Sequence, residues 1–158
     1  MDKLIVVSAL TGNVPTRATS PNVPLTPEEI AEDVRRCADA GSSMFHVHAR
    51  DDQGKPSLSA EIYLEIVKNI KQVAPEVIVM LSTGGRASKD PEARAAPVRL
   101  SPEIASITTG SNNLPGIIYE NSPQLIEFLA GVFREYAVKP EIEVFEAQIL
   151  ELLGKGDQ

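Results

Sequence analysis

Residues 25–52 read LTPEEIAEDVRRCADAGSSMFHVHARDD, and in this stretch a helix pattern runs directly into a strand pattern. Thr26, Pro27 and Glu29 occupy the N-cap, first and third positions of a capping box, and Gly41 is typical of a helix end. Residues 43–49 then form a short run with the composition of a strand. The stretch therefore predicts a helix followed at once by a strand.

The alternation of strand and helix patterns continues on both sides of this stretch. Four more segments have the apolar or β-branched character of strands, namely 4–10, 77–83, 104–109 and 141–146. Helices are predicted over 59–76, with Ser59 as the N-cap, and over 121–140, and a last helix is expected to begin near 147. The prolines in 86–103 are expected to limit that link to one or two helical turns.

Strands that alternate with helices at this spacing form parallel β-α-β units with right-handed crossovers. An open doubly wound sheet and a (β/α)8 barrel both satisfy that pattern. The first loop, ALTGNVPT at 9–16, lacks the glycine-rich phosphate fingerprint of a dinucleotide-binding sheet, which favours the barrel. A barrel takes about 250 residues. We therefore expect residues 1–158 to be a single α/β domain, the N-terminal portion of a (β/α)8 barrel with about five of its eight strand-helix units.

The open sheet edge and the composition of such a domain indicate which kinds of partner it can have. An open sheet edge exposes apolar surface and unpaired backbone, so we expect a homo-oligomer or a missing C-terminal half to cover it. The formal charge of −7, with acidic and basic residues interspersed, argues against nucleic acid and anionic membranes as partners. Cys37 is the only cysteine, and no apolar run approaches the roughly 20 residues of a membrane span. These features predict a cytoplasmic protein.

Both histidines of the chain, His46 and His48, lie two residues apart near the end of the second predicted strand. Side chains two apart in a strand point to the same face, so the two imidazoles can meet one metal ion. A carboxylate must complete such a site, and Glu143 or Glu146 at the end of the fifth predicted strand are the candidates. From spacing alone, two unrelated histidines that happen to alternate remain the competing interpretation.

Other strands also end in polar groups. The third predicted strand runs into LSTGGR at 81–86, where the Gly84–Gly85 pair is expected to expose amide N–H groups beside the hydroxyls of Ser82 and Thr83. Such a nest binds a carboxylate or a phosphate, although an ordinary Gly-Gly turn has the same sequence. TGSNN at 109–113 and TGN at 11–13 end two more strands. Polar groups gathered at one end of the strands indicate an enzyme.

Taken in order, the motifs ALTGNVPT, DAGSSMFHVHARDD, LSTGGR, SPEIASITTGSNN and PEIEVFE resemble the β-keto acid cleavage enzymes, the family of the 3-keto-5-aminohexanoate cleavage enzyme. The resemblance runs to about residue 147. It implies a (β/α)8 barrel with a zinc ion at the carboxyl ends of the strands. It also implies a reaction in which a β-keto acid and acetyl-CoA, as co-substrate, give acetoacetate and an acyl-CoA.

The resemblance also implies roles for individual residues. His46 and His48 are then two zinc ligands, and Glu143, beside the metal, is the catalytic candidate. The implied substrate-binding residues are Ser82, Thr83, Gly84, Gly85, Ser106 and Thr108. Zinc fits the expected chemistry because a metal ion polarises a carbonyl group and stabilises the negative charge that develops on its oxygen.

Two departures from the family pattern bear on function. Some relatives carry a carboxylate two positions after the glycine of the first loop, where this chain has Val14, which suggests a substrate without a cationic amino group. The family's third zinc ligand, a glutamate, and its catalytic acidic residue lie in the half of the barrel that this sequence lacks. The competing hypothesis is therefore a truncated, catalytically inactive barrel fragment that acts only as a folding or association module.

Overall fold

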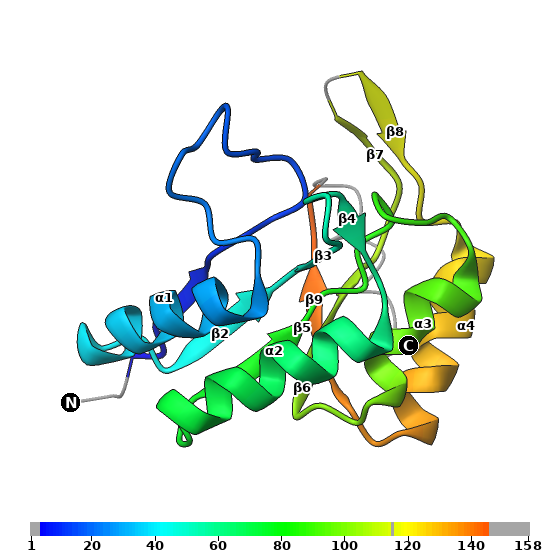
Figure 1. The fold of residues 1–158 in the computed structure, drawn as a ribbon. Helices are drawn as coiled ribbons and strands as arrows, with labels where there is room; N and C mark the ends of the chain where they lie inside the picture. The colour runs from blue at the N-terminus through cyan, green and yellow to red at the C-terminus, as the bar shows by residue number, and fades with distance from the viewer. Residues whose placement is uncertain (1–3, 115, 146–158) are drawn as a thin grey trace.

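Five parallel strands form the main sheet of the computed structural model, which describes residues 4–114 and 116–145 (Figure 1). In spatial order they are β1 (Val7–Ala9), β2 (Met44–Val47), β5 (Ile78–Leu81), β6 (Ile104–Thr108) and β9 (Lys139–Glu143). Spatial order equals chain order, as in a barrel, whereas a doubly wound sheet reverses direction at a switch point. The described strands thus form a barrel-type sheet with β1 and β9 as its edges.

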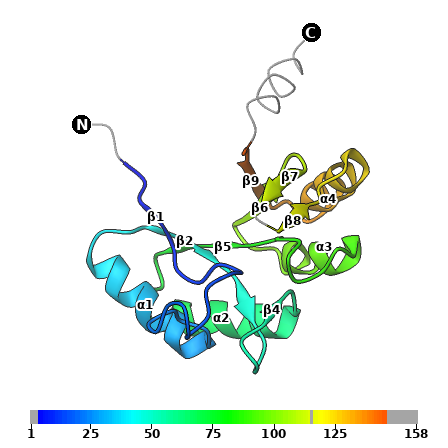
Figure 2. The ribbon, with the colours of Figure 1, turned by 90° about the horizontal axis from the view of Figure 1, so that it is seen from above.

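Four helices connect successive strands and lie on one face of this sheet (Figure 2). They are α1 (Pro27–Asp39), α2 (Ala60–Val73), α3 (Pro91–Arg99) and α4 (Pro123–Glu135). One apolar core lies between α1, α2 and strands β2 and β5, and includes Ile30, Phe45 and Ile66. A second core lies between α3, α4 and β6. The opposite face of the sheet, called the inner face below, carries none of these four helices (Figure 2).

The capping signals place the helices where the sequence predicts them. The Thr26 hydroxyl accepts a hydrogen bond from the Glu29 amide at 3.3 Å, and the Glu29 carboxylate accepts one from the Thr26 amide at 3.1 Å. Ser59 caps α2 by accepting a hydrogen bond from the Ile62 amide at 3.4 Å. These bonds satisfy amide groups that have no partner within the first helical turn.

The link over 86–103 contains a longer helix than its prolines suggest. Helix α3 spans nine residues, about two and a half turns, and holds Pro97 inside it. Asp90 starts the helix by accepting hydrogen bonds from the Glu92 and Ala93 amides, both at 3.3 Å. The one- or two-turn prediction was wrong because Pro97 lies in the last turns, where its missing N–H removes a single intrahelical bond.

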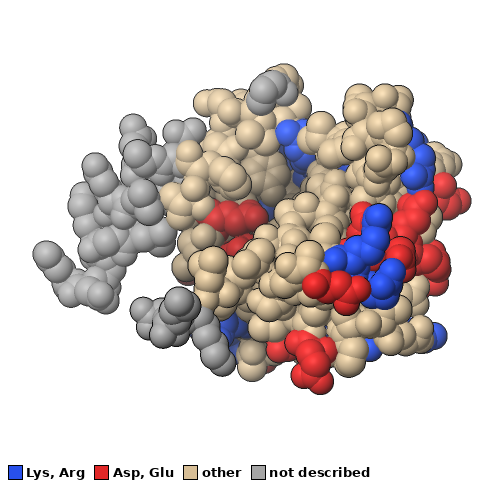
Figure 3. Space-filling view, turned by 90° about the vertical axis from the view of Figure 1, so that its left-hand side faces the viewer, with Lys and Arg blue, Asp and Glu red and all other residues tan. Residues whose placement is uncertain are grey.

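The first strand differs from its prediction in length and burial. Only Val7–Ala9 pairs with β2, and Leu4 and Ile5 are 86% and 63% exposed. A nearly continuous apolar run is typical of a strand covered on both faces, but β1 is an edge strand with β2 as its only described neighbour. Figure 3 looks from this side: uncharged residues cover much of the surface, most charged residues gather at the right of the view, and an acidic patch lies left of the centre.

Two short antiparallel hairpins extend the strand ends without having been predicted. Strands β3 (Ala49–Arg50) and β4 (Pro56–Ser57) follow β2, and strands β7 (Asn112–Leu114) and β8 (Ile117–Tyr119) follow β6. Their strands are too short for a periodic pattern to appear in the sequence. The helix expected to begin near 147 lies outside the described residues. Within the described part of the chain, no helix has the length and apolar character needed to cross a membrane.

Replacing Thr26 by alanine tests the capping box. Thr26→Ala removes the hydroxyl acceptor, so we expect the free energy of unfolding to fall by about 1 kcal/mol, measured by urea denaturation. Lys68→Ala, an exposed change inside α2, is the control and should stay within about 0.5 kcal/mol of the unmodified chain. Equal stabilities for both variants would contradict the capping role.

Candidate active site at the carboxyl ends of the strands

Alternation along β2 sends its histidines to the face opposite the helices. Phe45 and Val47 are fully buried in the core formed with α1 and α2. His46 therefore points to the inner face, and His48, which directly follows the strand, does the same. Their Nε2 atoms lie 3.0 Å apart. The expectation that both rings meet on one side of the sheet is confirmed by this contact.

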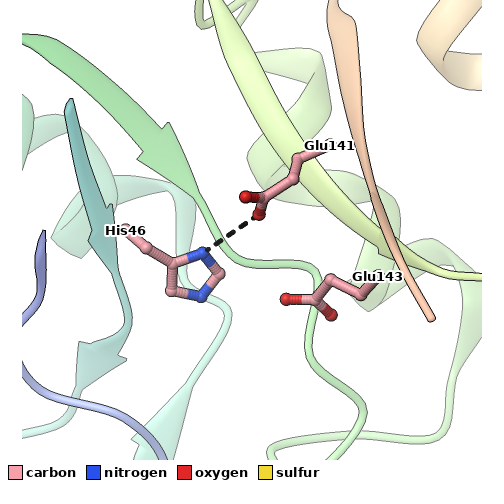
Figure 4. A group of neighbouring side chains, drawn as sticks. All are labelled: His46, Glu141 and Glu143. Carbon is pink, nitrogen blue, oxygen red and sulfur yellow. Dashed lines mark ion pairs between the residues drawn. The ribbon is translucent and has the colours of Figure 1, made fainter. Parts of the chain in front are cut away.

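Two carboxylates from β9 lie beside His46 on the inner face. Figure 4 shows Glu141 and Glu143 pointing toward His46, and the ligand atoms of the three residues lie within 4.8 Å of one another. The Nδ1 atom of His46 is 3.8 Å from the Glu141 carboxylate. Strands β2 and β9 are three places apart, or about 14 Å in a flat sheet. The sheet must curl strongly for these side chains to meet.

Glu141 was not among the residues that the sequence singled out. The signal was present, because Glu141, Ile142 and Glu143 repeat the alternation of His46, Val47 and His48. Sequence reasoning placed the carboxylates at the end of the strand and so passed over the residue two positions earlier. Glu146, the other carboxylate proposed from sequence, lies outside the described residues.

A cavity of about 210 Å³ opens beside this cluster. Four of the predicted metal-binding, substrate-binding and catalytic residues line it, namely His48, Ser82, Gly84 and Glu143. The other lining residues are Asn13, Val14, Arg86, Asn112, Leu114, Tyr119 and Phe145. Larger hollows occur on the surface, but they lie away from both histidines. The small cavity is therefore the candidate active site.

The loop at 82–85 has a different hydrogen-bond pattern from the expected nest. The Gly84 amide donates to the Ser82 hydroxyl oxygen at 3.1 Å, and the Gly85 amide donates to the Tyr119 hydroxyl at 3.0 Å. Both amides are thus engaged within the protein, which corrects the expectation of exposed N–H groups. The Ser82 hydroxyl still has its own proton to donate, because the Gly84 amide uses only its oxygen.

The remaining predicted substrate-binding residues hold neighbouring groups in place and are not among the residues that line the cavity. Thr83 is buried and donates its hydroxyl proton to the Ser106 carbonyl at 2.7 Å. Thr108 is buried and donates to the Glu143 carboxylate at 2.7 Å. The Ser106 side chain is buried on the inner face as well. In this geometry Thr108 orients Glu143, and Thr83 ties the loop after β5 to β6.

Arg94 of α3 holds this loop in place, a role that no sequence pattern indicates. The side chain is 1% exposed. Its Nε donates to the Thr83 carbonyl at 2.9 Å, and its two terminal nitrogens donate to the Glu120 carbonyl at 3.1 Å and to Asn121 Oδ1 at 2.7 Å. A Cβ at Gly85 would lie 3.0 Å from the guanidinium, so glycine permits this close approach. Burial lowers the pKa of Arg94.

Burial also sets the protonation of His48. Burial first, and then the neighbouring His46 and Arg50, lower the pKa of His48 to about 3, so the ring is neutral at neutral pH. Arg50 is itself buried and donates to the Gly12 and Pro15 carbonyls of the first loop and to the Gly54 carbonyl. It therefore fixes the first loop against the β3–β4 hairpin.

A parallel sheet whose spatial order follows the chain order, with helices on one face, is typical of α/β proteins of the barrel type. Within that class, a family profile described as "beta-keto acid cleavage enzyme" matches residues 3–155. The chain belongs to this family. It is 36% identical over 97% of its length to the 3-oxoadipate:acetyl-CoA acetyltransferase of Cupriavidus necator. It is 38% identical over 96% of its length to the 3-keto-5-aminohexanoate cleavage enzyme of Acetoanaerobium sticklandii.

Solved structures agree with this assignment. The apo structure of ObcA superposes with a TM-score of 0.74 at 27% identity, over 88% of this chain and 33% of that chain. A ternary complex of ObcA with a C4-CoA adduct and oxalate superposes with a TM-score of 0.73. The chain spans about half the length, 56%, of the two curated relatives named above.

Replacing Arg94 by lysine tests its role in the loop. Lysine keeps the charge, but its N–H donors share a single nitrogen, which cannot reach the three acceptors that now bond the three separate nitrogens of Arg94. We expect Arg94→Lys to lower the free energy of unfolding by about 2–4 kcal/mol, measured by urea denaturation. Arg134→Lys, on the exposed part of α4, is the matched control and should have little effect. A loss below about 0.5 kcal/mol for Arg94→Lys would show that these bonds contribute little.

Proposed function

We propose that this chain provides the N-terminal part of the active site of a zinc-dependent β-keto acid cleavage enzyme. The reaction converts a β-keto acid and acetyl-CoA into acetoacetate and an acyl-CoA. The observation that carries the proposal is the convergence of His46, His48 and Glu143 beside one small cavity that Ser82 also lines. Membership of the family and the names of the curated relatives support the reaction type.

His46 and His48 are the proposed metal ligands of this chain. Two nitrogens bound tetrahedrally to zinc at about 2.0–2.1 Å lie roughly 3.3–3.4 Å apart, close to the 3.0 Å between the two Nε2 atoms. Glu141 faces the other nitrogen of His46, at 3.8 Å, in the place of a carboxylate that orients a ligating histidine. A zinc ion there supplies Lewis-acid polarisation of a carbonyl group.

Ser82 and Glu143 have separate proposed roles in the cavity. The Ser82 hydroxyl, whose proton is available, donates to the carboxylate of the β-keto acid and so orients it. Glu143, held by Thr108, is a carboxylate that can accept or return a proton in the cavity, alongside the catalytic acidic residue that the family has in its other half. Thr83, Gly84, Gly85 and Ser106 keep these groups in position.

The residues that line the cavity also indicate which type of β-keto acid it can bind. Val14, Leu114 and Phe145 give it an apolar wall, and Glu143 is the carboxylate among its described lining residues. A cationic amino group on the substrate would therefore lose its hydration against this wall without gaining a second anionic partner. We propose a β-keto acid whose acyl tail carries no positive charge.

Zinc titration by calorimetry tests the metal ligands. The chain is expected to bind zinc weakly, because two histidines without the family's third ligand leave an incomplete site. His46→Ala should abolish this binding, and Glu141→Gln should weaken it by about 10-fold because His46 loses the group that orients it. Asp52→Ala, an exposed acidic change elsewhere, is the control and should bind as the unmodified chain does. Tight binding that survives His46→Ala would place the zinc site elsewhere.

Acetoacetate release from a β-keto acid and acetyl-CoA tests the reaction. We expect negligible turnover by the 158-residue chain alone, and recovery when the C-terminal half of a relative is supplied as a separate chain or by fusion. In the reconstituted enzyme, Glu143→Gln should lower kcat by about 10²–10⁴-fold, the usual loss for a positioned acid–base group. Glu76→Gln, at an exposed position remote from the cavity, is the control. Strong zinc-dependent turnover by the chain alone would contradict the incomplete site.

A further inference from the structure

Asn112 is a buried polar residue for which the proposed function has no role so far. It belongs to β7, it is 5% exposed, and it lines the 210 Å³ cavity. Among the residues that the structure describes, neither its Nδ2 nor its Oδ1 has a hydrogen-bond partner. A buried carboxamide with both polar atoms unpaired costs stability, so it needs an explanation.

The hairpin holds Asn112 at this place. Asn112 lies opposite Tyr119 in the β7–β8 pair, so both side chains are on the same side of the hairpin. The Tyr119 hydroxyl accepts the Gly85 amide proton, which anchors the hairpin to the Ser82–Gly85 loop. The nearby Asn121 is different, because its Nδ2 donates to the Gly110 carbonyl and its Oδ1 accepts from Arg94. The fold thus satisfies one buried carboxamide and leaves the other directed at the cavity.

The two unpaired atoms indicate the chemistry of the missing partner. Nδ2 requires an acceptor and Oδ1 requires a donor, and a ligand with two neighbouring secondary amides supplies the acceptor from one amide and the donor from the other. A β-keto acid at neutral pH offers only acceptor oxygens in its carboxylate and keto groups. The pantetheine arm of acetyl-CoA carries secondary amides, and it is the part of the co-substrate that must extend toward the reacting carbon.

We propose that Asn112 binds the two amides of the pantetheine arm, with Nδ2 donating to the oxygen of one amide and Oδ1 accepting from the N–H of the other. The inference rests on the proposed function, because that function supplies acetyl-CoA as the co-substrate. It assigns the wall formed by the β7–β8 hairpin to the CoA arm, and it leaves the Ser82 side of the cavity to the keto acid.

The experiment compares two probes on three chains. S-Methyl pantetheine represents the arm without a free thiol that would bind zinc, and acetoacetate represents the β-keto acid. Each is titrated by calorimetry into the unmodified chain, into Asn112→Leu and into Asn113→Leu. Leucine copies the branched shape of asparagine without its polar atoms, and Asn113 is the exposed neighbour on the same strand.

We expect Asn112→Leu to weaken S-methyl pantetheine at least about tenfold and to leave acetoacetate unchanged. Asn113→Leu should bind both probes as the unmodified chain does. In the absence of ligand, Asn112→Leu should also raise the thermal unfolding midpoint, because it removes two unpaired buried atoms. If the Asn112 side chain instead stabilised the ligand-free fold, Asn112→Leu would lower the thermal unfolding midpoint.

Several outcomes would overturn the inference. The inference fails if Asn112→Leu binds S-methyl pantetheine as tightly as the unmodified chain does. It also fails if the unmodified chain does not bind S-methyl pantetheine. A selective loss of acetoacetate binding would assign Asn112 to the acid instead. Should Asn112→Leu fail to fold, the same titrations with Asn112→Ala decide the question. If no chain binds acetoacetate while S-methyl pantetheine still depends on Asn112, the proposed keto-acid function fails and the assignment of Asn112 stands.

Discussion

The curl of the parallel sheet is the constraint on which the rest of this structure depends. Strands β2 and β9 are separated by β5 and β6, yet His46 on one lies 3.8 Å from Glu141 on the other. In a flat sheet the spacing of the strands alone would keep these groups apart. Right-handed twist accumulates when consecutive parallel strands are added on the same side, and this turns their inner faces toward one another.

The helices and the strand period together decide what the inner face contains. Each helix packs on the outer face, so the apolar residues of β2 and β6 point outward and bury their area there. The alternate positions, including His46, Ser106 and Thr108, are left inside. Polar groups can be buried at those positions only if they have partners. Glu143 is such a partner for the Thr108 hydroxyl, and the buried Thr83 hydroxyl in the loop after β5 donates to the Ser106 backbone carbonyl.

Arg94 explains how the strand ends keep a defined shape without regular pairing. A buried guanidinium must have its hydrogen-bond donors satisfied, and here the acceptors are backbone and side-chain oxygens from two loops far apart in the chain. The same loops carry Ser82 and Tyr119 to the cavity. The edges of the sheet, β1 and β9, bear exposed apolar side chains, including Val7 and Ile142.

The sequence by itself determined the local elements and the direction of several side chains. Thr26 and Ser59 start helices because short-range capping bonds need only neighbouring residues, and His46 and His48 share a face because the strand period is two. Only the tertiary structure decided the surroundings of Glu141, Arg94 and Asn112. Their partners, or the absence of a partner among the described residues, depend on segments that are distant in the sequence, and curvature and loop packing bring those segments together without leaving a periodic signal in the chain.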